Sequence, residues 1–199
     1  GYNPEEDMLK VYEDEHPDFF VVGIHLPFAR NWRNLGKLKT PKAIMCGDEF
    51  KDIEAHIPFI NENHVNLALL DNYQKFFQSY IDRTGGICLV KPFFRSVNPS
   101  LFKDYGEPKT YDIFFSGVIS EEYPLRVVIR NALSEAKEIK SYYNYKRLTL
   151  EDYAKQLSKA KICVFDNSKW NQLLPRHFEV MASKVLLMCP MPDDGEEAH

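Results

Sequence analysis

The chain has 199 residues, of which 44% are hydrophobic and 27% charged, a composition typical of a soluble globular protein with one large or two small domains. Its net charge of −4, without a long basic run, argues against nucleic acid as the main partner. No apolar run approaches the roughly 20 residues of a membrane-spanning helix. The four cysteines lie in apolar runs without C-x-x-C spacing, so we expect reduced, mostly buried thiols and a cytoplasmic protein.

In the first half of the chain, short apolar runs alternate with amphipathic stretches. Helices are predicted at residues 5–15 and 73–81, where apolar side chains recur at helical spacing. The run at 19–24 is apolar throughout, which predicts a strand buried on both faces. Further strands are predicted at 43–46, 65–70 and 87–90.

Residues 93–109 interrupt this pattern with Pro99, Gly106 and Pro108, and they are the best candidate for a linker. Beyond them the alternation resumes. Thr149 is expected to cap a helix, with Asp152 at the capping-box position. The predicted strands are 111–116, 139–143, 161–165 and 185–189, and the predicted helices are 125–139, 150–159 and 175–183.

Strand–helix alternation on both sides of a linker predicts an α/β protein with two Rossmann-type halves, each built on a parallel sheet. The predicted boundaries are a first domain at 1–95, a linker at 96–109 and a second domain at 110–199. We expect the two halves to face a cleft and to be incomplete at the outer ends. Ligands of such sheets bind at the carboxyl ends of the strands.

The helix predicted to begin at Pro175 is the clearest candidate for a binding site. Arg176 and His177 follow the proline, and a helix start combined with basic side chains suits an anion such as a diphosphate. A cation in a first helical turn is otherwise unfavourable. Alternatively, Arg176 pairs with a nearby acid, and His177 serves packing or capping.

Other candidates follow predicted strands. Gly117 either lets the backbone approach a ligand or only shapes a turn, and Arg126 reaches a phosphate or pairs with a nearby glutamate. In the first half, Asp48 and His25 follow strands, where each could face a ligand. Asp48 could instead cap a helix, and His25 could be a turn residue.

No metal site is expected, because the histidines lack ligand spacing. The chain contains neither a P-loop nor a G-x-G-x-x-G sequence. The loop at 166–168 follows a strand and could contact a base or sugar.

Several stretches, in their order and spacing, carry a family resemblance. They are Val97 to Phe102 followed by Tyr111 to Gly117, then Tyr123 to Arg126, and finally Arg176 to Ser183. Together they resemble GT-B glycosyltransferases, and more specifically the CgeB-like group. The strand and aspartate at 42–48 are similar to that group as well, so that the resemblance covers about residues 17–198.

The resemblance implies a metal-independent transferase without a cofactor, whose second domain holds a nucleotide-sugar donor and whose first domain holds the acceptor. In the wider retaining family, the second-domain helix carries a Glu-x(7)-Glu pattern. Its later glutamate, which contacts the ribose, matches Glu179. Its earlier position, which contacts the donor sugar, falls on Asn171.

The leading hypothesis is therefore transfer of a sugar from a nucleotide sugar to an unknown acceptor. Arg176 and its helix start would stabilise the leaving diphosphate, and Asp48 is the candidate base. The alternative is a catalytically silent nucleotide-sugar-binding or scaffold module. A nucleotide-sugar epimerase is disfavoured, because a dinucleotide glycine fingerprint is missing.

Overall fold

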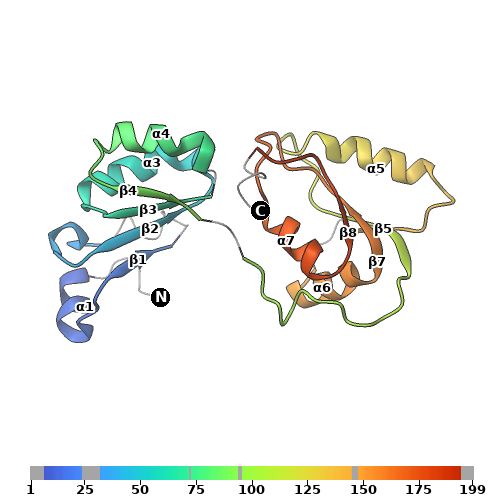
Figure 1. Cartoon of the computed structure of the whole chain (residues 1–199), viewed down its shortest axis with the longest axis horizontal. Helices are drawn as coiled ribbons and strands as arrows, with labels where there is room; N and C mark the ends of the chain where they lie inside the picture. Colours follow the sequence, from blue (N-terminus) through green and yellow to red (C-terminus); the bar gives the residue numbers. More distant parts are fainter. Residues whose placement is uncertain (1–6, 24–31, 72, 94–95, 145–147, 194–199) are drawn as a thin grey trace. The chain divides into compact units, whose positions relative to one another are not determined.

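In a computed structural model of the chain, residues 7–23, 32–71, 73–93, 96–144 and 148–193 are described. The chain divides into two compact units, Gly1–Phe94 and Arg95–His199. Each unit contains a parallel four-stranded sheet with helices packed against it (Figure 1). The prediction of an α/β protein with two Rossmann-like halves is thereby confirmed.

The first unit has a sheet in which the strand order follows the chain order, β1-β2-β3-β4. Its strands are β1 (Phe20–Val22), β2 (Lys42–Cys46), β3 (Leu67–Leu70) and β4 (Leu89–Pro92). Its helical elements are α1 (Met8–Glu15), the 3-10 turn η1 (Leu35–Lys37), α3 (Glu49–Glu62) and α4 (Tyr73–Arg83).

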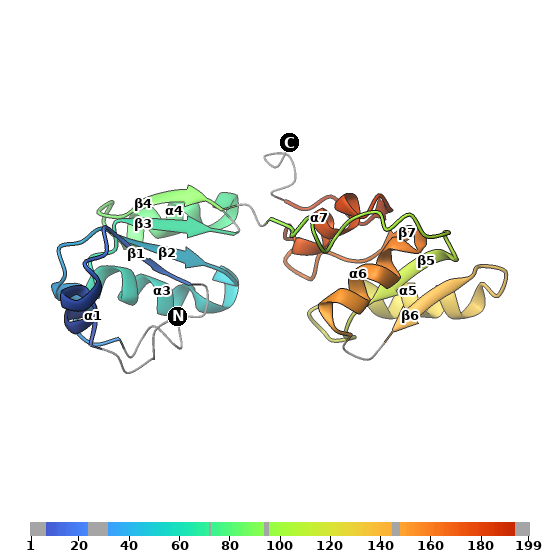
Figure 2. The same cartoon turned by 90° about the horizontal axis from the view of Figure 1, so that it is seen from below.

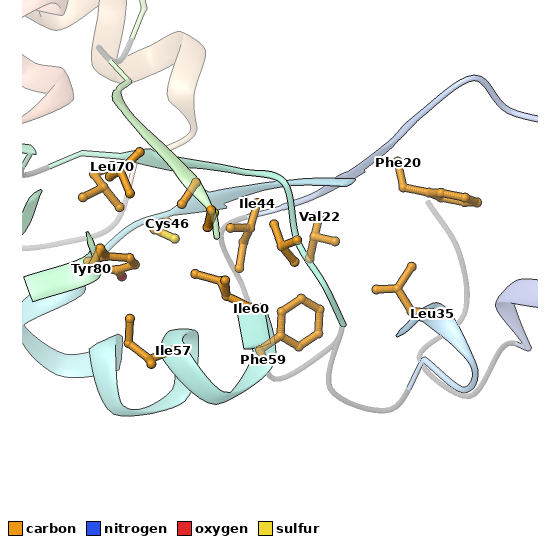
Figure 3. Packing of buried hydrophobic residues seen from close by; sticks show 14 of the residues in the cluster. Phe20, Val22, Leu35, Ile44, Cys46, Ile57, Phe59, Ile60, Leu70 and Tyr80 are labelled. Atoms are coloured by element: carbon orange, nitrogen blue, oxygen red, sulfur yellow. The ribbon is translucent and has the colours of Figure 1, made fainter. Parts of the chain in front are cut away.

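Every crossover in this sheet steps in the same direction, and right-handed crossovers then place their helices on one face. Figure 3 shows the resulting core, in which Ile44 and Cys46 of β2 lie close to Ile57 and Ile60 of α3. The opposite side of the edge strand β1 is open, since Val21 is 48% exposed. The prediction that this strand is buried on both faces is therefore wrong for its described residues.

The helix ends follow local chemistry. Helix α1 begins at Met8, later than predicted, because the Asp7 carboxylate accepts the Leu9 N–H at 3.1 Å and caps the helix there. Helix α4 ends before Gly85 and Gly86, which adopt positive φ angles, as predicted.

The second unit has a sheet whose strand order, β6-β5-β7-β8, departs from the chain order. Its strands are β5 (Tyr111–Ser116), β6 (Ser141–Asn144), β7 (Ala160–Val164) and β8 (Leu186–Met188). Its helices are α5 (Leu125–Glu135), α6 (Leu150–Ser158) and α7 (Pro175–Ala182).

The chain reverses direction across this sheet, because β6 lies on one side of β5, whereas β7 and β8 lie on the other. Right-handed crossovers then place α5 on one face and both α6 and α7 on the other. Figures 1 and 2 allow this arrangement to be followed within the second unit. Its core includes Phe114, Leu157, Phe165 and Val180, each at most 1% exposed.

The described part of the predicted linker contains neither helix nor strand, but it packs on the second unit. Phe102 is only 4% exposed and joins that unit's core, where its ring meets Tyr153 edge-on at 5.9 Å. The Tyr105 hydroxyl donates to the Leu101 carbonyl at 2.6 Å. From residue 96 onward the segment is thus held by contacts of its own.

The four cysteines are free thiols, and Cys46, Cys88 and Cys163 are buried. Burial raises the pKa of Cys88 to about 11 and that of Cys163 to about 12. These thiols are therefore protonated at neutral pH, as expected of side chains that pack as small hydrophobes.

Candidate functional site

The strand order of the second unit gives its sheet a point of reversal between β5 and β7. In open α/β sheets, ligands bind outside the carboxyl ends of the strands at such a point. The described strands of the first unit show no reversal. The loops that follow β5 and β7, together with the start of α7, therefore form the candidate site.

Helix α7 begins as predicted, with Pro175 at its first position. The ring nitrogen Nδ1 of His177 lies 3.0 Å from the Leu174 backbone nitrogen, and the ring meets Phe165 edge-on at 4.9 Å. Burial lowers the pKa of His177, so the imidazole is neutral near pH 7. The ring thus packs on Phe165 and contacts the start of the helix, and its predicted part in donor binding stays a prediction.

The Arg176 side chain turns back toward the sheet. Its Nη1 donates to the carbonyl oxygen of Ser116, the last residue of β5. Its guanidinium carbon lies 5.6 Å from the ring centres of both Tyr153 and Phe165. The guanidinium is thus held between two aromatic rings and a backbone carbonyl at the end of β5.

Arg126 is only 6% exposed and pairs with Asp166, 40 residues further along the chain. Its Nε donates to the Asp166 carboxylate at 3.1 Å, and its Nη1 donates to the Val118 carbonyl at 2.6 Å. The guanidinium carbon also lies 3.5 Å from the centre of the Tyr123 ring. The partner is thus an aspartate after β7, not one of the glutamates near Arg126 in sequence.

Burial lowers the pKa of Arg126, and the positive charge of Arg176 lowers it further. The two guanidinium groups therefore lie close enough to repel one another at the end of β5. Asp166 compensates part of this charge through its contact with Arg126. The negative charge of Glu179 acts on Arg176 and offsets a further part.

Gly117 lies between these two arginines, with a φ of +146° that favours glycine. A Cβ atom at this position would lie 2.5 Å from Nη1 of Arg126. The group that approaches this glycine in the structure is therefore the Arg126 guanidinium. The close approach of a ligand to its backbone remains a prediction.

Asp166 and Asn167 follow β7 and are each 1% exposed. In the described part of the chain, Asp166 Oδ2 and Asn167 Oδ1 are buried without a hydrogen-bond partner. Sequence reasoning noted this loop, but it did not single out the two side chains. The sequence signal for them is a pair of polar residues shortly after a buried parallel strand, and many loops share this pattern.

Asn171 is predicted to contact the donor sugar, yet its side chain is engaged within its own unit. The amide nitrogen donates to the Met191 carbonyl at 2.9 Å and to the Asp193 carboxylate at 2.7 Å. The amide oxygen accepts from Asn167 at 3.1 Å. Asn171 therefore ties the loop after β7 to the segment after β8.

Glu179 lies in the second turn of α7 and is partly buried. Burial raises its pKa, while the positive charge of Arg176 opposes this shift. A half-buried carboxylate beside a cation can accept hydrogen bonds from vicinal hydroxyl groups. Its predicted contact with a ribose is compatible with this setting and stays a prediction.

In the first unit, Asp48 lies two residues after the end of β2 and is exposed. It occupies the N-cap position of α3 with a φ of 53°, but its side chain makes no capping hydrogen bond. The neighbouring Glu49 is fully buried and accepts the Asp71 N–H at 2.7 Å. Asp48 is thus accessible at a carboxyl strand end, whereas the predicted His25 lies outside the described residues.

Within the described ranges, no three His, Cys, Asp or Glu side chains come close enough together to hold a metal ion. Among the same residues, none of the helices combines the length and the apolar character needed to cross a bilayer.

No protein-family model matches this sequence, and no curated protein is significantly similar to it.

Proposed function

We propose that the chain binds a nucleotide-sugar donor at the carboxyl ends of β5 and β7 and transfers the sugar to an acceptor, as a CgeB-like GT-B glycosyltransferase. The observation that carries the proposal is the reversal of strand order between β5 and β7, where α7 begins and two arginines converge. Reversal points of parallel sheets are the usual sites of nucleotide binding.

The donor's diphosphate would lie near the start of α7 and the loop after β5. The helix start and the charges of Arg126 and Arg176 favour an anion there. Glu179 would accept the hydroxyl protons of the ribose in hydrogen bonds. These groups stabilise the charge that grows on the leaving diphosphate.

In the transfer, the bond between the sugar's anomeric carbon and the diphosphate oxygen breaks, and the electron pair leaves with the diphosphate. A hydroxyl oxygen of the acceptor then forms the new bond to the anomeric carbon. Asp48 is the proposed base that takes the hydroxyl proton, since it is an exposed carboxylate at a carboxyl strand end. The reaction needs neither a metal nor a cofactor.

A second candidate is a nucleotide-sugar-binding module without transferase activity. It is favoured by Asn171, whose side chain is already bonded to Asn167, Met191 and Asp193. The Asn171 side chain would then not be available for the contact with the donor sugar that the resemblance implies.

The proposal is tested by thermal unfolding with UDP, GDP, ADP and their sugars. A ligand at about 100 times its Kd adds ~2.7 kcal/mol of stability, which raises the Tm of a protein of this size by several degrees. If no nucleotide raises the Tm, the proposed function is wrong. Turnover of the bound donor with a panel of acceptor glycans then separates the transferase from the silent binder.

A variant pair assigns the binding to this site. Glu179→Gln is expected to reduce the Tm shift given by the nucleotide, because a neutral amide accepts hydrogen bonds more weakly than a carboxylate. Glu135→Gln, at the exposed end of α5, is the matched control and should leave the shift unchanged. If the nucleotide gives the same Tm shift in both variants, Glu179 does not contact the nucleotide.

A further inference from the structure

Two buried or half-buried guanidinium groups hold the backbone on either side of Gly117. Nη1 of Arg176 donates to the carbonyl of Ser116, and Nη1 of Arg126 donates to the carbonyl of Val118 at 2.6 Å. Arg126 is in turn fixed by Asp166 at 3.1 Å. The loop at 116–119 is therefore oriented by its carbonyl groups.

This arrangement dictates where the N–H groups of the loop point. All peptide bonds of the described residues are trans, and in a trans peptide the C=O and the following N–H point in opposite directions. Because the carbonyls of Ser116 and Val118 face the guanidinium groups, the N–H groups of Gly117 and Ile119 face away from them. Neither N–H has a hydrogen-bond partner within the described part of the chain.

A second observation beside the loop also indicates a ligand. Asp166 and Asn167, each 1% exposed, carry one oxygen apiece without a hydrogen-bond partner among the described residues. Buried polar atoms in folded proteins are normally paired. The N–H groups of the loop can bind an anion, whereas the two oxygens can bind only a donor, such as a hydroxyl group of the same ligand.

We infer that Arg126 and Arg176 are positioning residues, which orient the loop so that the N–H groups of Gly117 and Ile119 bind the diphosphate of the donor. The guanidinium groups support the bound charge through the field, while Nη1 of Arg176 bonds Ser116 and Arg126 bonds Asp166 and Val118. This inference rests on the proposed function. It replaces a direct Arg176–phosphate contact with an indirect one.

The test is a titration of the whole chain with inorganic pyrophosphate, and then with UDP, followed by ¹H–¹⁵N NMR. The amide signals of Gly117 and Ile119 are expected to shift in a saturable manner with both ligands. The Nε–Hε signals of Arg126 and Arg176 are expected to keep their positions. Shifted arginine signals with stationary loop amides would overturn the inference, and so would a stationary loop with both ligands.

A variant separates positioning from a merely structural role. Arg176→Met keeps much of the side-chain volume but cannot donate to Ser116, so the Gly117 amide signal should move even without ligand, and pyrophosphate should bind roughly tenfold more weakly. Arg130→Met is the control for lost charge, because Arg130 of α5 bonds its neighbour Asn131 and, among the described residues, has no bond to the loop at 116–119. Equal pyrophosphate affinities in the two variants would contradict the inference.

The two proposals fail in different ways. If UDP raises the Tm but the loop amides do not respond, the proposed function stands and the positioning role is wrong. If pyrophosphate moves the loop amides while no nucleotide or nucleotide sugar binds, the loop is an anion site and the glycosyltransferase proposal is wrong.

Discussion

At the scale of single residues, the backbone after β5 is packed so closely that Gly117 has no room for a Cβ atom. Gly117 has φ +146°, and the Arg126 guanidinium occupies the place where a Cβ atom would lie. A side chain here would strain the backbone and displace a buried cation from Asp166. The glycine is therefore required by the protein itself, whatever ligand binds beside it.

Gly117→Ala is expected to lower the free energy of unfolding by about 2–4 kcal/mol, through backbone strain and the clash with Arg126. Urea denaturation measures the loss. The matched control is Gly106→Ala, because Gly106 also has a positive φ, of 71°, but no atom lies within 4 Å of its added Cβ. Equal losses in the two variants would show that Arg126 does not occupy this space.

Arg126→Met is expected to destabilise the second unit by about 3 kcal/mol or more, because it leaves the buried Asp166 carboxylate without its cation. Lys161→Met removes the partner of Asp112 in an exposed pair at 2.6 Å, and it should change stability little. Denaturant unfolding of both variants gives the comparison. A loss from Arg126→Met as small as that of the exposed pair would contradict the buried ion pair.

Acid is expected to destabilise the protein through His177. Burial lowers the pKa of His177 in the folded state below its ordinary 6.5, so the unfolded chain binds the proton more readily. The stabilising contribution is present above pH 6.5 and is lost as the pH falls through the folded pKa. His177→Gln should therefore flatten the decline of the unfolding free energy below pH 6.5.

The control for this profile is His64→Asn. His64 is exposed and has a φ of 51°, a conformation that asparagine tolerates. Its variant should keep the slope of the wild-type protein. If His177→Gln also keeps that slope, His177 is not buried as a neutral imidazole.

At the scale of elements, helix α6 shows how far local chemistry decides a boundary. The Thr149 hydroxyl accepts the Asp152 N–H at 3.1 Å and donates to the Asp152 carboxylate at 2.7 Å, as the capping pattern predicts. Helix α3 shows the opposite case. It runs for 14 residues through Pro58, a residue that in sequence indicates a helix end.

Thr149→Ala is expected to cost about 1 kcal/mol, because the first turn of α6 loses its cap. Thr149→Ser keeps a hydroxyl at the same position and should remain close to the wild-type stability. The free energies follow from chemical denaturation monitored by circular dichroism. A serine variant as unstable as the alanine variant would rule out capping as the cause.

At the scale of the whole molecule, the chain builds two separate cores. Each cluster of buried hydrophobic side chains draws its members from a single unit, the first from Met8 to Val90 and the second from Phe102 to Val185. Ile60 and Leu157 are fully buried members of the first and the second cluster, so a cavity at either position opens within that cluster.

Ile60→Ala is expected to destabilise the first unit by about 2–5 kcal/mol, and Leu157→Ala should do the same in the second. Hydrogen exchange followed by mass spectrometry locates each effect. Faster exchange is expected in β2 and β3 for the first variant and in β5 and β7 for the second. Equal acceleration in both units for either variant would mean that they unfold as one.

The sequence predicted where the strands lie more accurately than it predicted the burial and the long-range partners of their side chains. The bounds of β5 agree with the predicted run, because an apolar segment between turn residues is a local signal. The exposure of Val21 was not foreseen, since an apolar run does not reveal that its strand lies at the edge of a sheet. The carboxylate that pairs with Arg126 was missed for a similar reason, as Asp166 lies 40 residues away.

By itself, the sequence determined the fold class, the α/β alternation in both halves and the start of α7, because periodicity, caps and prolines act over a few residues. Only the tertiary structure decided the order of the strands and what the site residues contact. It joined Arg126 to Asp166 across 40 residues and Arg176 to Ser116 across 60. Such contacts depend on the direction in which each crossover steps across the sheet, and that direction is set by packing between distant segments.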